Sequence, residues 1–229
     1  MYFNEVWDIV GKLPYTNRER CEWLYNFVIN NSLEKILELG FAYGKTTCVM
    51  AKALDDFAER GDKYGFIDTI DLESQREWQK PSIEDNLWKS RLDDHVQVYR
   101  EKTGYLWWLA KKIQEQSVGY SICKPLYDFV FVDGSHRWHT DSSAFFLADK
   151  LLKRGGYMLF DDYLWTFDGA MGGDITFETD RREMSDEERK TPHIKLIVDL
   201  LVRQHPGYVV EDVMIGDKKD EWWVLARKL

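Results

Sequence analysis

Residues 36–47 read Ile36-Leu37-Glu38-Leu39-Gly40-Phe41-Ala42-Tyr43-Gly44-Lys45-Thr46-Thr47. An apolar run typical of a buried strand passes into two glycines separated by three residues, and then into a helical pattern. Glycines let the backbone approach a ligand closely, and the amides at the start of a helix attract polar or negative groups. The stretch therefore predicts a nucleotide-type loop between a strand and a helix.

Short β-rich runs alternate with longer helical patterns along most of the chain. The predicted strands are Lys35–Leu39, Phe66–Asp71, Val96–Tyr99, Phe129–Val132 and Tyr157–Phe160. Between them, residues 46–57 and 142–152 place apolar side chains at helical spacing. Strands separated by helices in this way favour a parallel sheet and an α/β fold.

The last part of the chain breaks this alternation. Residues 208–215 and 221–227 are β-rich runs with only a short polar connection between them, which predicts a hairpin. Before the hairpin, Ser185 and Glu188 form a capping-box pattern that opens a helix, and Pro192 interrupts that helix.

We expect residues 1–229 to form one domain. Residues 1–34 supply an N-terminal helical segment, with a helix around Asn17–Val28. Residues 163–184 contain glycines and show no clear periodicity, which predicts a substrate loop or lid over a site.

Composition limits the classes of protein. A chain of 229 residues that is 44% hydrophobic and 31% charged has the material of a globular core. Its longest stretch without a charged residue, Trp23–Leu33, is shorter than the ~20 residues of a membrane-spanning helix. Glu5 and Asp8 stand where a signal peptide needs a basic start. We therefore expect a cytoplasmic protein that does not bind membranes.

Charge and cysteine usage exclude two further classes. The net charge of -9, with no segregated basic face, argues against nucleic-acid binding. Cys21, Cys48 and Cys123 are odd in number and lack the paired spacing of zinc or redox motifs, so we expect reduced thiols.

The glycine loop is open to several interpretations. A phosphate-binding P-loop needs four residues between its glycines, whereas Gly40 and Gly44 enclose three. A dinucleotide fingerprint needs a third glycine. The loop could also serve close packing alone. Asp71, at the end of the next predicted strand, favours a nucleoside ligand, because a carboxylate there can accept ribose hydroxyls; the alternative for Asp71 is a helix N-cap.

The sequence Glu38-Leu39-Gly40-x-x-x-Gly44 followed by Asp71 resembles the class I S-adenosylmethionine-dependent methyltransferases. The resemblance implies a three-layer Rossmann-like fold with a mostly parallel seven-stranded sheet and a C-terminal antiparallel hairpin, whose last strand is inserted. It also implies S-adenosylmethionine as cofactor. The cofactor-binding residues that it implies are Glu38, Gly40, Phe41, Gly44, Thr46, Asp71, Leu72 and Asp133.

A second group of polar residues follows two later strands. Asp133 ends one predicted strand, and Asp161 and Asp162 end the next. The ends of neighbouring parallel strands meet at one edge of a sheet, so the three carboxylates can converge there. Carboxylates that converge repel one another unless a cation such as Mg²⁺ joins them. The sequence therefore predicts a divalent metal held by these aspartates.

This second group resembles the metal-dependent O-methyltransferases of the catechol type. The step from Asp133 to His136 is closer to the natural-product and sugar O-methyltransferases, and that resemblance implies that His136 is the catalytic base. The predicted function is methyl transfer to a small acceptor that carries hydroxyl groups. Helix capping remains an alternative for each aspartate. A P-loop-like NTPase or a non-catalytic nucleotide-binding or scaffold protein remains an alternative for the whole chain, and a homo-oligomer is left open.

Overall fold

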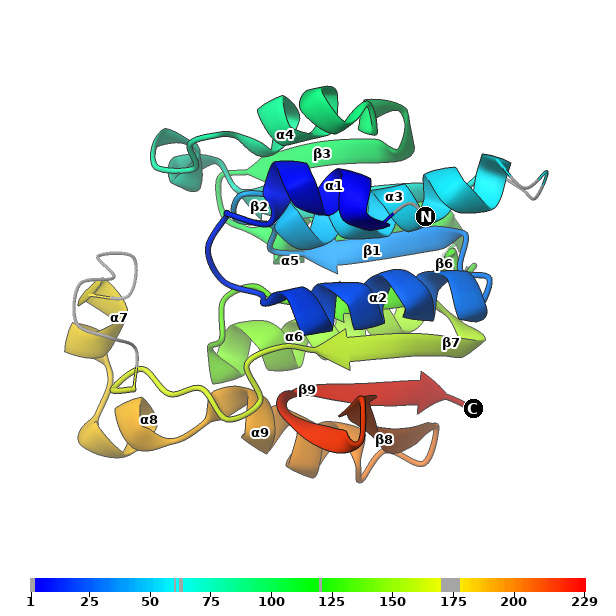
Figure 1. The fold of residues 1–229 in the computed structure, drawn as a ribbon. Helices are drawn as coiled ribbons and strands as arrows, with labels where there is room; N and C mark the ends of the chain where they lie inside the picture. The colour runs from blue at the N-terminus through cyan, green and yellow to red at the C-terminus, as the bar shows by residue number, and fades with distance from the viewer. Residues whose placement is uncertain (1–2, 60, 62–63, 120, 170–177) are drawn as a thin grey trace.

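The computed structural model describes residues 3–59, 61, 64–119, 121–169 and 178–229. In these residues a seven-stranded sheet forms the centre of the molecule, with strand order β3-β2-β1-β6-β7-β9-β8 (Figure 1). Its strands are β1 (Lys35–Leu39), β2 (Phe66–Leu72), β3 (Val96–Glu101), β6 (Tyr127–Val132), β7 (Leu152–Phe160), β8 (Tyr208–Ile215) and β9 (Lys218–Lys228). The first five are parallel, and β9 runs antiparallel to both β7 and β8.

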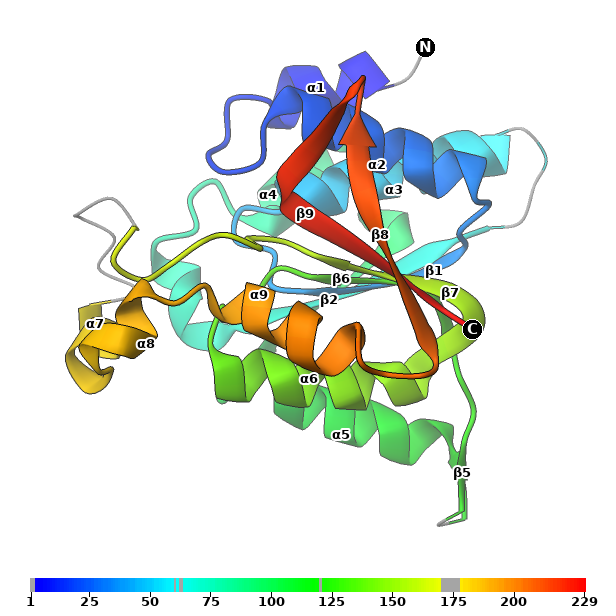
Figure 2. The ribbon, with the colours of Figure 1, turned by 90° about the horizontal axis from the view of Figure 1, so that it is seen from below.

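Helices cover both faces of the sheet (Figure 2). One face carries α1 (Phe3–Val10), α2 (Arg18–Asn30), α3 (Lys45–Glu59) and α4 (Ile83–Ser90). The other face carries α5 (Tyr105–Gln116), α6 (Trp138–Leu151) and α9 (His193–Ile197). The remaining elements are η1 (Glu73–Glu77), η2 (Asp93–His95), β4 (Ser117–Val118), β5 (Ile122–Cys123), α7 (Glu178–Glu183), α8 (Asp186–Lys190) and the π-helical turn η4 (Val198–Val202). Helices on both faces of a mostly parallel sheet confirm the predicted three-layer α/β fold.

The two faces of β1 pack into separate cores. Ile36 packs into the core on the α1–α4 face, whereas Leu37 and Leu39 pack into the core on the α5–α6 face. Both faces of the strand are therefore buried, which explains its nearly continuous apolar sequence. Glu38 alternates with its neighbours and shares the face of Ile36, on which α3 also lies.

The five predicted parallel strands and the hairpin are confirmed. Strand β1 has the predicted bounds, and the other four parallel strands extend beyond theirs. The hairpin turn is shorter than residues 216–220, because Lys218 already pairs with Ile215 and Gly216 takes the left-handed φ of +59° that a tight turn requires. Strand β7 begins at Leu152, so the helix predicted to end there ends one residue earlier.

The segment after residue 163 is partly described. Residues 170–177 of the predicted loop at 163–184 lie outside the described residues, Phe167 is buried, and α7 follows. The capping box is confirmed, since the Ser185 and Glu188 side chains each accept a hydrogen bond from the other residue's amide. Pro192 separates α8 from α9, as predicted. Within the residues described, no helix combines the length and apolar character that crossing a bilayer requires.

Candidate functional site

The loop that joins β1 to α3 lies against the end of β6. Gly40 has a φ of +91°, and a Cβ atom at this position would lie 1.9 Å from the carbonyl oxygen of Asp133. No side chain fits at that separation, so only glycine lets the two backbones meet. The contact brings the glycine loop beside the strand end that carries Asp133.

The second glycine ends this loop. Gly44 has a φ of +78°, its amide donates to the Phe41 carbonyl at 2.6 Å, and a Cβ atom here would lie 2.4 Å from Cγ1 of Ile83. The Phe41 ring is buried, with the guanidinium of Arg100 4.9 Å from its centroid. The side chain of Phe41 thus anchors the loop on the β3 side.

Glu38 lies fully buried beneath the loop and is surrounded by hydroxyl groups. It accepts hydrogen bonds from Thr46 Oγ1 at 2.7 Å, from Thr69 Oγ1 at 2.6 Å, and from Thr47 Oγ1. Burial raises the pKa of this carboxyl to about 7, against the opposing effect of the three hydroxyl donors. These bonds tie α3 to β1 and β2, and the sequence pattern did not reveal the contributions of Thr47 and Thr69.

Replacing Glu38 by Gln should change how stability depends on pH. The folded pKa of about 7 lies above the ordinary 4.5, so the folded protein binds this proton more tightly than the unfolded chain does. Wild-type stability should therefore fall relative to that of Glu38→Gln as the pH rises through this window, by up to about 3 kcal/mol. Urea unfolding of both proteins at pH 5 and pH 8 measures the difference. A gap between them that is independent of pH would contradict this prediction.

Asp71 lies at the end of β2, beside the glycine loop. Its Oδ2 accepts hydrogen bonds from the amides of Ala42 at 3.1 Å and Phe41 at 3.4 Å and from Gln79 Nε2 at 2.9 Å. Its Oδ1 accepts from the amide of Leu72 at 2.7 Å. Burial raises the pKa of Asp71, and these hydrogen bonds oppose the rise. Asp71 thus fixes the loop as well as standing where a ribose is predicted.

A small hollow opens between the glycine loop and the segment that joins α1 to α2. Its lining includes Tyr15 and Thr16 from that segment, Ala42 from the loop, Lys45 from α3, and Asp133. The hollow therefore combines a wall from the N-terminal part of the chain with the loop and strand end that the sequence singled out.

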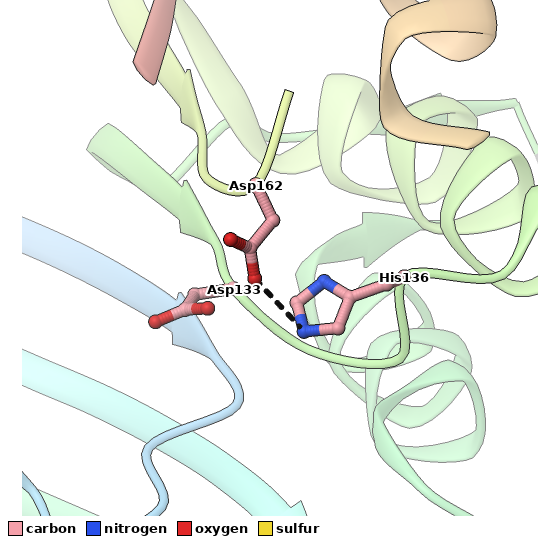
Figure 3. A group of neighbouring side chains, drawn as sticks. All are labelled: Asp133, His136 and Asp162. Carbon is pink, nitrogen blue, oxygen red and sulfur yellow. Dashed lines mark ion pairs between the residues drawn. The ribbon is translucent and has the colours of Figure 1, made fainter. Parts of the chain in front are cut away.

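Three side chains from the loops after β6 and β7 meet at the same edge of the sheet (Figure 3). One ligand atom from each of Asp133, His136 and Asp162 lies within 4.8 Å of the other two, and His136 Nε2 is 3.4 Å from Asp162 Oδ2. Figure 3 shows Asp162 reaching toward the other two residues from the loop after β7. Two predicted metal ligands are thus grouped with the predicted base.

Asp161, the third predicted metal ligand, lies outside this group. Its Oδ1 accepts the amide of Asp162 at 2.6 Å. Burial and the charge of Asp162 raise the pKa of Asp161 to about 7. Burial also raises the pKa of Asp162 to about 6, and the charge of Arg20 opposes both shifts. Burial, together with Asp161 and Asp162, raises the pKa of Asp133 well above its ordinary value. Among the described residues, the structure groups His136 rather than Asp161 with the other two aspartates.

Strained backbone gathers at this site. Ala42, His136 and Asp162 have φ values of +45°, +57° and +56°, a region that costs residues with a side chain about 1–3 kcal/mol each. His136 is 8% exposed, and burial lowers the pKa of its imidazole while Asp141 and Asp161 oppose that shift. Such conformations concentrate at functional sites because surrounding contacts hold them.

The sequence pattern did not reveal the residues that hold the His136 loop. Tyr105 Oη accepts the amide of Ser135 at 3.1 Å and donates to Asp141. Asp141 is fully buried, so the Tyr105 hydroxyl links the Ser135 amide to a carboxylate in the core. A Cβ atom on Gly134 would lie 2.5 Å from the Tyr105 ring, so this turn packs directly on α5. The only local signal for Asp141 is an acid on the helix that follows His136.

The donor set of Asp133, His136 and Asp162 fits a divalent cation. Two carboxylates and one imidazole suit first-row metals such as Mn²⁺ or Fe²⁺, whereas Mg²⁺ prefers oxygen ligands alone. Buried carboxylates with raised pKa values also gain from a neighbouring positive charge. The residues present can therefore hold a divalent metal, and Mg²⁺ itself stays a prediction.

Comparison with known proteins adds a family and a fold. Residues 37–163 match the family described as "Methyltransferase domain", a span that includes the glycine loop and the group around His136. No curated protein matches the chain in sequence.

Solved structures match over nearly the whole chain. An O-methyltransferase from Bacillus cereus in complex with SAH has 19% identity and a TM-score of 0.65, with 99% of this chain and 90% of that one covered. The O-methyltransferase TomG from Streptomyces achromogenes, involved in tomaymycin synthesis and in complex with SAM, has 16% identity, a TM-score of 0.63 and coverages of 99% and 88%. An SAH-bound methyltransferase from Podospora anserina has 15% identity, a TM-score of 0.62 and coverages of 99% and 87%. At such identities the likeness establishes the fold.

Proposed function

This chain belongs to the methyltransferase-domain family, and from that premise we propose that it transfers the methyl group of S-adenosylmethionine to an oxygen of a small-molecule acceptor. The family match covers residues 37–163, more than half of the chain. The similar structures of O-methyltransferases bound to SAH and SAM support both the cofactor and an oxygen acceptor. The resemblance read from the sequence is confirmed for family and fold, and the P-loop alternative is not favoured.

The observation that carries this proposal is the junction of the glycine loop with the end of β6. Gly40 and Gly44 pack the loop against the end of β6 and against Ile83, and the loop held in this way would line the cofactor site. Asp71 would accept a hydrogen bond from a ribose hydroxyl at Oδ1, where the Leu72 amide uses one of two lone pairs, whereas Oδ2 already accepts three hydrogen bonds. The hollow beside Asp133 would then take the other end of the cofactor.

His136 is proposed as the base that activates the acceptor. Its Nε2 would take the hydroxyl proton while the acceptor oxygen attacks the methyl carbon. The carbon–sulfur bond breaks with its electrons left on sulfur, which yields S-adenosylhomocysteine. Burial lowers the pKa of His136 and so favours the neutral imidazole that this step needs. A divalent cation held by Asp133 and Asp162 would supply positive charge for the developing acceptor oxyanion.

The surroundings of His136 suit an acceptor with a ring and hydroxyl groups. The Trp165 ring lies 5.1 Å from the imidazole at an angle of 50°, so an apolar wall stands beside the proposed base. Aromatic walls next to a few placed polar groups are typical of small-molecule sites.

The binding of S-adenosylhomocysteine tests the proposed function. This product should raise the melting temperature, by mass action on the folded state, whereas ATP with Mg²⁺ should not. Thermal unfolding with each compound measures the effect. Stabilisation by ATP with Mg²⁺ but not by S-adenosylhomocysteine would overturn the proposal in favour of an NTPase.

Substitution of Asp71 tests the ribose contact. Removal of a charge-assisted acceptor costs about 1.5–3 kcal/mol, so Asp71→Ala should weaken S-adenosylhomocysteine binding by roughly ten- to a hundredfold. Asp68→Asn, on the same strand but bonded to Tyr127, is the matched control and should bind as the wild type does. Calorimetric affinities that are equal for wild type and Asp71→Ala would rule out this role.

A further inference from the structure

Lys45 is a buried lysine on the wall of the hollow. Its side chain lies on the first turn of α3, the residue is 7% exposed, and Nζ donates to the carbonyl oxygen of Thr16 at 2.8 Å. Its ammonium also lies 5.6 Å from the centre of the Trp7 ring. An ammonium has three N–H donors, and the bond to Thr16 uses one of them.

Lys45 forms no ion pair with a carboxylate among the described residues. Burial accordingly lowers the pKa of this amine. By contrast Lys52, on the same helix and equally buried, pairs with both Asp55 and Asp56. A buried charge normally requires such a partner, so the site of Lys45 favours an anion from outside the chain.

Lys45 shares the hollow with a group of the opposite charge. Asp133 lines the same hollow, and so does the backbone segment at Thr16 that Lys45 holds in place. The first-turn amides of α3 add positive potential on the Lys45 side. A cation and a carboxylate on the wall of one small hollow match the two charges of an amino-acid group.

We propose that Lys45 binds the carboxylate at the amino-acid end of the cofactor, with the α-ammonium of that end facing Asp133. The proposal rests on the proposed function and assigns this end of the cofactor to the hollow, away from the ribose at Asp71. Through its bond to Thr16, the same lysine makes the segment between α1 and α2 part of the cofactor site.

Two ligands that differ only at this end provide the test. S-adenosylhomocysteine carries the amino-acid group, whereas 5′-methylthioadenosine has the adenosine and sulfur but lacks that group. Lys45→Met should weaken S-adenosylhomocysteine binding by about ten- to a hundredfold, the range for a lost charge-assisted bond, and should change 5′-methylthioadenosine binding less than about twofold. Lys45→Arg, which keeps the charge, should retain most of the affinity. Isothermal titration of both ligands measures these constants.

Lys35→Met is the matched control, because it removes one positive charge at the opposite end of β1 and far from the hollow. It should bind both ligands as the wild type does. Circular dichroism checks the fold of each variant, and Lys45→Gln replaces Lys45→Met if the latter does not fold.

The outcomes separate the two proposals. An equal loss of affinity for both ligands would mean that Lys45 only supports the wall at Thr16, and it would overturn this inference while leaving the proposed function intact. Unchanged binding of S-adenosylhomocysteine to Lys45→Met would also overturn it. Failure of the wild type to bind S-adenosylhomocysteine would overturn the proposed function, and this inference with it.

Discussion

Excess EDTA is expected to abolish methyl transfer while the affinity for S-adenosylhomocysteine stays unchanged. Asp133, His136 and Asp162 offer ligand atoms within 4.8 Å of one another. Burial makes it costly to keep Asp133 and Asp162 ionised without a neighbouring cation. The proposed cofactor contacts at Gly40, Asp71 and Lys45 involve none of these three side chains, so they should persist without the metal. A radiolabelled methyl-transfer assay over a panel of catechols and sugars, combined with calorimetry, measures both properties. Full transfer in excess chelator would contradict the metal's role.

Two aspartate variants distinguish which carboxylate binds the metal. Asp162→Asn should reproduce chelation, because Asp162 belongs to the group around His136. Asp161→Asn keeps an oxygen that can accept the amide of Asp162, so it should retain far more Mn²⁺ affinity. Electron paramagnetic resonance of bound Mn²⁺ measures this affinity. Equal losses in the two variants would favour the set of three aspartates predicted from the sequence.

His136→Ala is expected to lower turnover by about 10²–10⁴, the usual range for the loss of a positioned general base. The structure makes this test sharper, because the base and a metal ligand would use the same nitrogen. Nε2 is the atom that lies 3.4 Å from Asp162 Oδ2. If His136 is the base, the variant should bind Mn²⁺ as tightly as the wild type, and turnover alone should fall.

The Mn²⁺ affinity and the turnover of His136→Ala together decide whether His136 is the base. Loss of Mn²⁺ binding together with turnover would assign His136 to the metal instead, and unchanged turnover would remove it from the reaction. His139→Ala is the matched control, since His139 is exposed and lies three residues further along the chain. It should leave turnover and metal binding unchanged.

Local signals explain what the sequence could predict. Residues 36–47 carry the strand, the two glycines and the start of the helix next to one another in sequence. A loop at the end of that strand could therefore be predicted. The grouping of Asp133 with Asp162 follows from topology, because the carboxyl ends of adjacent parallel strands share an edge.

Contacts between distant residues explain what was missed. Thr69 reaches Glu38 across 31 positions, and Tyr105 reaches Asp141 across 36, so no spacing rule connects either pair. Helix α5 escaped prediction for a different reason. Trp107 is 59% exposed while the adjacent Trp108 is buried, so the apolar face of this helix is blurred in the sequence.

The sequence pattern did not show that His136, and not Asp161, would join the group formed with Asp133 and Asp162. The two aspartates are adjacent in sequence, but Asp162 has a φ of +56° and belongs to the group around His136, whereas Asp161 Oδ1 accepts the Asp162 amide. A sequence pattern does not encode that conformation, because aspartate enters the left-handed region only where its surroundings hold it there.

The contact of Gly40 with the Asp133 carbonyl also bears on how such a protein can diversify. The backbone of the proposed cofactor loop and the backbone that leads to the proposed base meet at a contact with no room for a single added carbon. A substitution of Gly40 would disturb the proposed cofactor site and the proposed acceptor site together. In the proposed enzyme, new acceptor preferences would therefore arise by substitution of side chains around His136, such as Trp165, while the contact between Gly40 and Asp133 is kept.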